Sequence, residues 1–256
     1  MSDRPHGAPD LRAPTLADLT GSLRAGIRDF VAAPHLGLFF AGFYVVVGIL
    51  MAAITYATGT TFWLILAVLG FPLIGAFAAL GLYEVRRRRQ AGDALPFSEG
   101  VSVGGAQKNG QLPWLAVMVV VLFLFWFFLG HMIFALFLGL SPMTNVSTSL
   151  DVYLTADGLM MLLFGSAVGA IFASLTFAMS VLGMPMLLDR DVDFITALTR
   201  SISAVADAPL IYLGWGAFIA AVTLAAMLPA FLGLFLVLPI LGHATWHLYR
   251  RVTDAA

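Results

Sequence analysis

All thirteen lysine and arginine residues of this chain lie on one side of a membrane if its six apolar runs cross that membrane in turn. The runs are residues 36–56, 61–83, 113–140, 157–188, 210–228 and 230–247. Each approaches or exceeds the ~20 residues that a helix needs to cross the hydrocarbon core. The positive-inside rule then places both termini and the basic residues in the cytoplasm. The expected topology determinants are Arg86, Arg87, Arg88, Arg89, Arg190, Arg250 and Arg251.

The composition indicates an all-α polytopic membrane protein, because 61% of the residues are hydrophobic and only 11% are charged. Cysteine is absent from the sequence, which excludes disulfides and thiolate chemistry. The net charge of -1 and the short basic clusters give no indication of a nucleic-acid partner. We predict a tail at residues 1–14 that is flexible, a single six-helix transmembrane domain at 15–251, and a short tail at 252–256.

A repeated unit is visible at the start of the outward-running spans, which open at or just after Pro34, Pro113 and Pro209. The segments before Pro34 and Pro209 have apolar residues at helical spacing, and the glycine-rich segment 97–110 before Pro113 is a weaker case. They predict amphipathic helices at the cytoplasmic surface before the odd-numbered spans. Residues 23–43 and 198–218 align without gaps at six identical positions. The chain therefore reads as three tandem hairpins.

Each returning span contains a proline, namely Pro72, Pro185 and Pro239. A proline inside a transmembrane helix frees a backbone carbonyl and kinks the helix. These prolines either shape the bundle or act as hinges. The fourth span also carries Gly165, Gly169 and Ala173 at four-residue intervals, a packing face for a helix of this chain or of another subunit.

Ionisable groups near the apolar runs are candidates for function because they are costly there. His243 and His247 lie one helical turn apart near the cytoplasmic end of the last span, and His35 and Glu84 are expected at the same level. This cluster is either one haem or divalent-metal site, or an ion-pair network with Arg86, Asp189 and Arg250. The depth of His131, in the outer half of the third span, excludes a two-haem electron path, since it has no histidine partner there. It is expected to be a hydrogen-bonded packing residue or a proton relay.

Aromatic side chains near the span ends fit the belts found at membrane boundaries. Tyr56 and Trp63 are expected at the outer boundary. The inner belt would hold Tyr83, Trp114, Trp246 and Tyr249.

Three segments, LGHATWHLYR at 241–250, MPMLLDRDVDFITA at 184–197 and GLYEVRRR at 81–88, resemble a family of bacterial multi-spanning inner-membrane proteins. The family has no established function and is sometimes labelled as a cytochrome c oxidase subunit. The resemblance extends over residues 23–251 and implies a six-span bundle in the bacterial inner membrane. Five histidines are too few for the metal centres of a catalytic oxidase subunit.

Three functions remain open. The first is a non-catalytic protein that assembles or stabilises a larger membrane complex, such as a respiratory complex, with the bilayer and other membrane subunits as partners. The second is a small transporter or channel with a site between the pseudo-repeats. The third is haem or metal binding by His35, Glu84, His243 and His247. The first interpretation predicts no enzyme activity and no cofactor.

Overall fold

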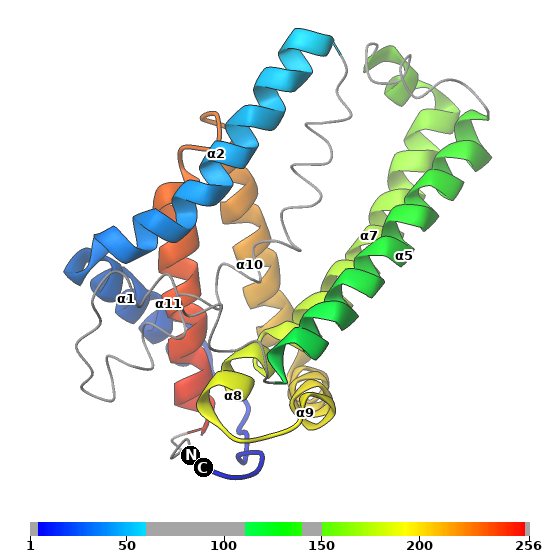
Figure 1. Ribbon diagram of the computed structural model, residues 1–256. Helices are drawn as coiled ribbons and strands as arrows, with labels where there is room; N and C mark the ends of the chain where they lie inside the picture. The colour runs from blue at the N-terminus through cyan, green and yellow to red at the C-terminus, as the bar shows by residue number, and fades with distance from the viewer. Residues whose placement is uncertain (1–4, 60–110, 140–149, 254–256) are drawn as a thin grey trace.

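The computed structural model describes residues 5–59, 111–139 and 150–253, which form an all-α bundle (Figure 1). Its long helices run side by side, and α8 and α9 lie beneath them at the end that also holds both termini. The elements are α1 (Leu16–Ala32), α2 (Pro34–Thr58), α5 (Leu112–Leu138), the 3-10 helix η1 (Leu150–Leu154), α7 (Ala156–Ser180), α8 (Gly183–Asp189), α9 (Phe194–Asp207), α10 (Pro209–Met227) and α11 (Leu234–Thr253).

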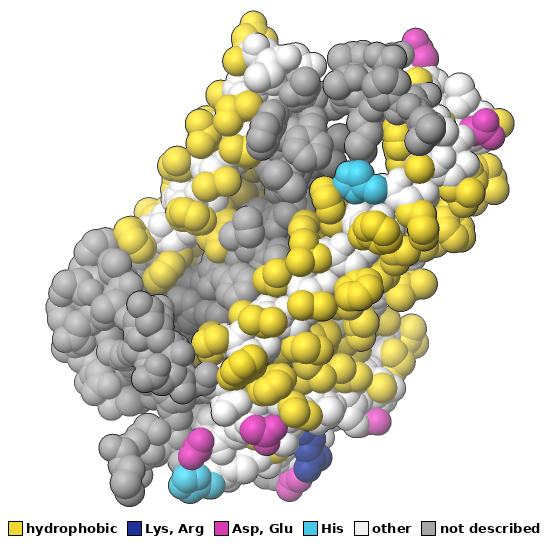
Figure 2. Space-filling model, turned by 45° about the vertical axis from the view of Figure 1, so that its right-hand side comes forward, with side chains coloured by type: hydrophobic (Ala, Val, Ile, Leu, Met, Phe, Trp, Pro, Cys, Tyr) yellow, Lys and Arg dark blue, Asp and Glu magenta, His cyan; other side chains and the backbone are white. Residues whose placement is uncertain are grey.

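Four helical stretches of the described part are long and apolar enough to cross a membrane: Gly37–Thr58, Leu112–Leu138, Ala156–Asp189 and Pro209–Met227. They correspond to the predicted first, third, fourth and fifth spans. The predicted second span, with Pro72, lies outside the described residues, as do Glu84, Trp63, Tyr83, segment 97–110 and Arg86 to Arg89. Figure 2 shows a broad hydrophobic band over α5 and α7 with charged side chains gathered at its two ends, the pattern expected of a membrane protein.

The predicted sixth span differs from the others. Residues 230–247 were expected to cross the membrane, but the helix here is α11, which is not among the four apolar stretches. Most of its second half is packed inside the protein, and this half also carries His243, His247, Arg250 and Arg251, of which Arg251 is exposed. The six-span count is therefore not confirmed.

The two predicted surface helices form, and each joins its span through the same bend. α1 begins with a capping box at Thr15 and Asp18, and α9 begins with Asp193 as its N-cap. Ala33, between α1 and α2, has φ -152° and ψ 68°, and Ala208, between α9 and α10, has φ -138° and ψ 59°. The residue before a proline avoids the helical region, and the proline itself fits the first helical turn. The sequence match around Pro34 and Pro209 thus corresponds to a shared local structure.

Both surface helices turn their apolar face to a proline-containing helix. α1 packs along α11, and α9 packs against α7 and α8. The larger buried cluster lies at the termini end and includes Trp246, Tyr249, Met186, Leu188 and Tyr212. Trp246 and Tyr249 are both 0% exposed, so the prediction that they belong to an aromatic belt is wrong. Their rings fill the space between helices, whereas Trp114 and Tyr56 are exposed as a belt requires.

Both ends of the chain, as far as the structure describes them, contact the helices. From Pro5 onward the N-terminal segment contacts the domain: Gly7 N–H donates to Asp191 O, and Arg12 N–H donates to Val252 O, both at 3.1 Å. Ala8 and Leu11 pack against the larger buried cluster. α11 continues to Thr253, with Val252 fully buried. These contacts remove apolar side chains of the N-terminal segment and of the end of α11 from solvent.

Candidate functional site

The ionisable side chains of the described residues that pair with one another gather at the termini end of the bundle. We call six of them the polar base: Arg12, Asp18, Asp29, Asp189, His247 and Arg250. They come from the N-terminal segment, α1, α8 and α11. The polar base therefore connects parts of the chain that are far apart in sequence.

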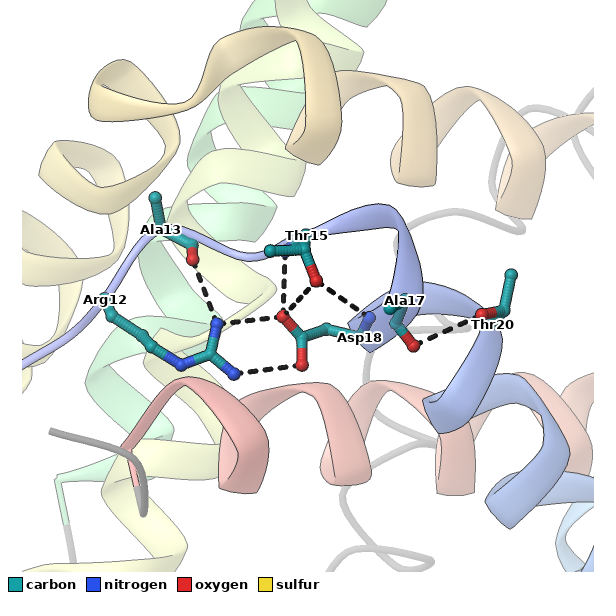
Figure 3. A network of polar contacts seen from close by, with 6 residues as sticks. All are labelled: Arg12, Ala13, Thr15, Ala17, Asp18 and Thr20. Carbon is teal, nitrogen blue, oxygen red and sulfur yellow. Dashed lines mark hydrogen bonds and ion pairs between the residues drawn. The ribbon is translucent and has the colours of Figure 1, made fainter.

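The first pair, Arg12 and Asp18, lies at the N-terminal end of α1 (Figure 3). Arg12 donates from both terminal nitrogens to the two carboxylate oxygens of Asp18, at 2.8 and 2.9 Å. The backbone N–H and the hydroxyl of Thr15 also donate to Asp18, each at 2.8 Å. The hydrogen bond from Arg12 holds the pKa of Asp18 well below its usual range, and Asp18 in turn raises the pKa of Arg12.

Asp18→Asn should lower the free energy of unfolding by about 1 kcal/mol, since it removes a partly exposed ion pair and weakens the capping box. A carboxylate with a lowered folded-state pKa contributes its full stabilisation above its unfolded pKa of about 3.9, and this contribution declines as the pH falls from that value toward the lower folded-state pKa. The difference in Tm between wild type and Asp18→Asn should thus be constant from pH 7 to 5 and narrow below about pH 4. Thermal unfolding in detergent at pH 7, 5 and 3 measures it, and a difference at pH 3 that is as large as the difference at pH 7 would contradict the assignment.

The second pair joins α11 to α1. Nε2 of His247 lies 2.6 Å from Oδ2 of Asp29, and the two side chains are only 15% and 12% exposed. Of the predicted cluster, His243 is buried one turn earlier on α11, and His35 is exposed at the second residue of α2. Within the described ranges, no three His, Asp or Glu side chains group as metal ligands would. Asp29, the carboxylate that His247 contacts, was not among the predicted site residues.

The third group joins α11 to the end of α8. The Tyr249 hydroxyl donates to Asp189 at 3.0 Å, and Arg250 donates to the same carboxylate at 3.3 Å. Asp189 and Arg250 were both named in the network interpretation of the cluster. Arg190 lies 4.0 Å from Asp189, so two of the predicted topology arginines have a carboxylate of their own chain nearby.

A hydroxyl group bridges the break between α7 and α8. The predicted fourth span is interrupted at Val181 and Leu182, which lie four and three residues before Pro185. Ser201 of α9 donates to Ala178 O at 2.6 Å and accepts from Leu182 N–H at 3.2 Å. These two backbone groups would be partners in an unbroken helix, so the fully buried Ser201 hydroxyl takes the place of a ladder bond. The sequence carries a signal for the break, Pro185, but none for the serine that satisfies it.

The other predicted packing residues are placed as follows. Pro239 lies inside α11, which remains one helix and passes close to Gly37 of α2. Gly165 and Gly169 face Ile133 and Trp126 of α5. Ala173 is exposed. His131 Nδ1 lies 2.8 Å from Phe127 O on its own helix, an arrangement suited to a packing residue.

Comparison with known protein families identifies a match to part of the chain. Residues 64–189, just under half of the chain, match a family described as predicted integral membrane protein (DUF2189). The described part of this segment comprises α5, η1, α7 and α8. No curated protein and no solved structure matches the chain. The expected resemblance to a membrane family of unknown function is confirmed at that level, and the oxidase label stays untested. By its apolar helices and by this match, the chain is a predicted integral membrane protein similar to the DUF2189 family.

Proposed function

We propose that the protein is a non-catalytic membrane subunit that packs against other membrane proteins and stabilises their assembly. The observation that carries this proposal is the hairpin of α5 and α7: among the described helices these two contact mainly each other, and they lie apart from α2 in Figure 1. Only 11% of the most apolar window of each helix is buried, compared with 28% for α2 and for α10. The hairpin thus offers two apolar helices to lipid or to further membrane helices.

The small residues of α7 support a helical partner. Gly165 and Gly169 are used for contact with α5, but Ser166, Ala170 and Ala173 form an exposed row at helical spacing. Small residues allow two backbones to approach closely, which is how helices associate where no hydrophobic driving force separates them from lipid. A second subunit could therefore pack on α7 beside α5.

The pairing of the polar base supports a structural role. Arg12, Asp18 and His247 each have a partner within this chain, and those contacts tie helices together. His131 contacts the backbone of its own helix. We place the chain in a bacterial inner membrane with both termini in the cytoplasm, on the distribution of its basic residues. The transporter and the haem or metal interpretations stay hypotheses, and the described contacts add nothing in their favour.

Replacing two of the exposed small residues of α7 by leucines should separate the protein from its partners. Ala170→Leu with Ala173→Leu puts large side chains where a second helix would approach, and the fraction that migrates in a larger complex should fall several-fold. The measurement is a native gel of membranes extracted in mild detergent, with the tagged full chain detected by antibody.

The matched control is Ala217→Leu with Ala221→Leu, two exposed alanines one turn apart on α10. This variant should keep the larger complex. Wild-type chain that migrates alone under every growth condition would refute the proposal, and equal loss in both variants would refute the assignment to α7.

A further inference from the structure

Three arginines gather on one face of α1, and we call them the arginine row: Arg24, Arg28 and Arg251. Arg24 and Arg28 are one turn apart on the helix, and both are exposed. Arg251 comes from α11, and its guanidinium lies over Gly21, one turn before Arg24. A Cβ on Gly21 would lie 2.9 Å from Cζ of Arg251. The guanidinium of Arg251 can therefore lie this close to α1 because residue 21 has no side chain.

Among the described residues, the charges of the arginine row have no carboxylate partner. None of the three forms an ion pair with any carboxylate of residues 5–59, 111–139 or 150–253. The two acidic side chains of α1 already have partners, because Asp18 binds Arg12 and Asp29 binds His247. By contrast, Arg12 and Arg250 at the same end of the bundle both pair with carboxylates. Three guanidinium groups are therefore available to an external anion.

The surroundings of the row point to a membrane surface. Val31, 70% exposed, shares the face of Arg24 and Arg28, and Ile27, 43% exposed, borders it. α1 is joined by the single residue Ala33 to α2, whose apolar stretch begins at Gly37. The end of α1 therefore lies where the membrane-crossing helix enters the lipid. Exposed apolar side chains next to arginines are typical of a helix at the boundary between headgroups and acyl chains.

We propose that the arginine row binds the phosphate groups of anionic phospholipids at the surface of the membrane that α2 enters. A guanidinium group donates two parallel hydrogen bonds to phosphate oxygens, and three of them along one helix face can contact neighbouring headgroups. Ile27 and Val31 would contact the acyl chains next to those headgroups. The arginine row includes two arginines of α1 beside a glycine, whereas α9, the corresponding helix before Pro209, has only Arg200.

The test measures binding of defined lipids to the full chain in detergent. Native mass spectrometry gives the Kd of phosphatidylglycerol and of phosphatidylcholine for wild type, and thermal unfolding with each lipid gives an independent readout. We expect phosphatidylglycerol to bind about tenfold or more tightly than phosphatidylcholine, since each arginine near anionic headgroups contributes severalfold. The triple variant Arg24→Gln, Arg28→Gln and Arg251→Gln should lose this preference, and Gly21→Ala, which displaces only Arg251, should lose part of it.

Arg200→Gln is the matched control, an exposed arginine on α9 whose removal should leave the preference unchanged. If the triple variant does not fold, the double variant Arg24→Gln and Arg28→Gln, confined to exposed positions, takes its place. Equal binding of the two lipids by wild type, or an unchanged preference in the variants, would overturn the proposal. So would equal stabilisation by inorganic phosphate, which would make the row a site for the free ion.

Discussion

Gly26→Leu is expected to unfold the termini end of the protein, with a loss of about 3 kcal/mol or more, because the site has no room for any side chain. A Cβ at Gly26 would lie 2.6 Å from the carbonyl oxygen of Ile240 and 2.8 Å from the amide nitrogen of Ala244. Both are backbone atoms of α11, so no rotamer change can relieve the contact. The variant must push α1 away from α11 along a long interface (Figure 1). Thermal unfolding of the purified protein in detergent, followed by size-exclusion chromatography, measures the loss.

Gly214→Leu on α10 is the control for this variant. Nothing lies within 4 Å of a Cβ at Gly214, and the residue is exposed. Its Tm should stay close to that of wild type, or rise slightly because glycine is a poor helix former. If Gly26→Leu and Gly214→Leu had the same Tm, the close contact between α1 and α11 would be refuted.

Ser201→Ala should lower the free energy of unfolding by about 2 kcal/mol, because it leaves two buried backbone groups without their partner. The Leu182 N–H and the Ala178 carbonyl are both bound by the serine hydroxyl, and the helix is broken between them. The substitution should destabilise the break between α7 and α8 locally and also lower the stability of the whole protein. Hydrogen exchange of peptides that contain Leu182 should become faster in the variant, and the Tm should fall.

Ser203→Ala, on the exposed side of the same helix, is the matched control. It should change neither the exchange at Leu182 nor the Tm by more than a small amount. Unchanged exchange at Leu182 in Ser201→Ala would show that the backbone groups find another partner, and the bridging role would then be rejected.

The sequence predicts the helices of this protein better than it predicts their contacts. The spacing of apolar residues before Pro34 and Pro209 indicated α1 and α9, and the prolines marked the bends at Ala33 and Ala208. These features depend on residues close together in the chain. Of the five predicted spans that lie in the described residues, four have matching apolar helices, because hydropathy over about 20 residues is also a local property.

The features that the sequence did not predict depend on which helices meet. Hydropathy marked residues 230–247 as a span, but it cannot show that α1 covers the second half of α11. Trp246 and Tyr249 are residue types that are common in interfacial aromatic belts. Only their burial between helices shows that they do not belong to one. His247 was grouped with histidines at its expected level, whereas its carboxylate partner, Asp29, lies 218 positions away in the chain. Pairing over such a distance leaves no periodic signal in one sequence.

The contact of α1 with α11 sets an order of events during synthesis. α1 leaves the ribosome long before α11 is made, so the face that includes Ala25 and Phe30 has no permanent cover while the middle helices enter the bilayer. That face must rest on lipid or on a chaperone until the last helix arrives. A nascent chain stalled before Leu234 would still expose it, and quality-control proteases would have a ready means of recognising the unfinished protein.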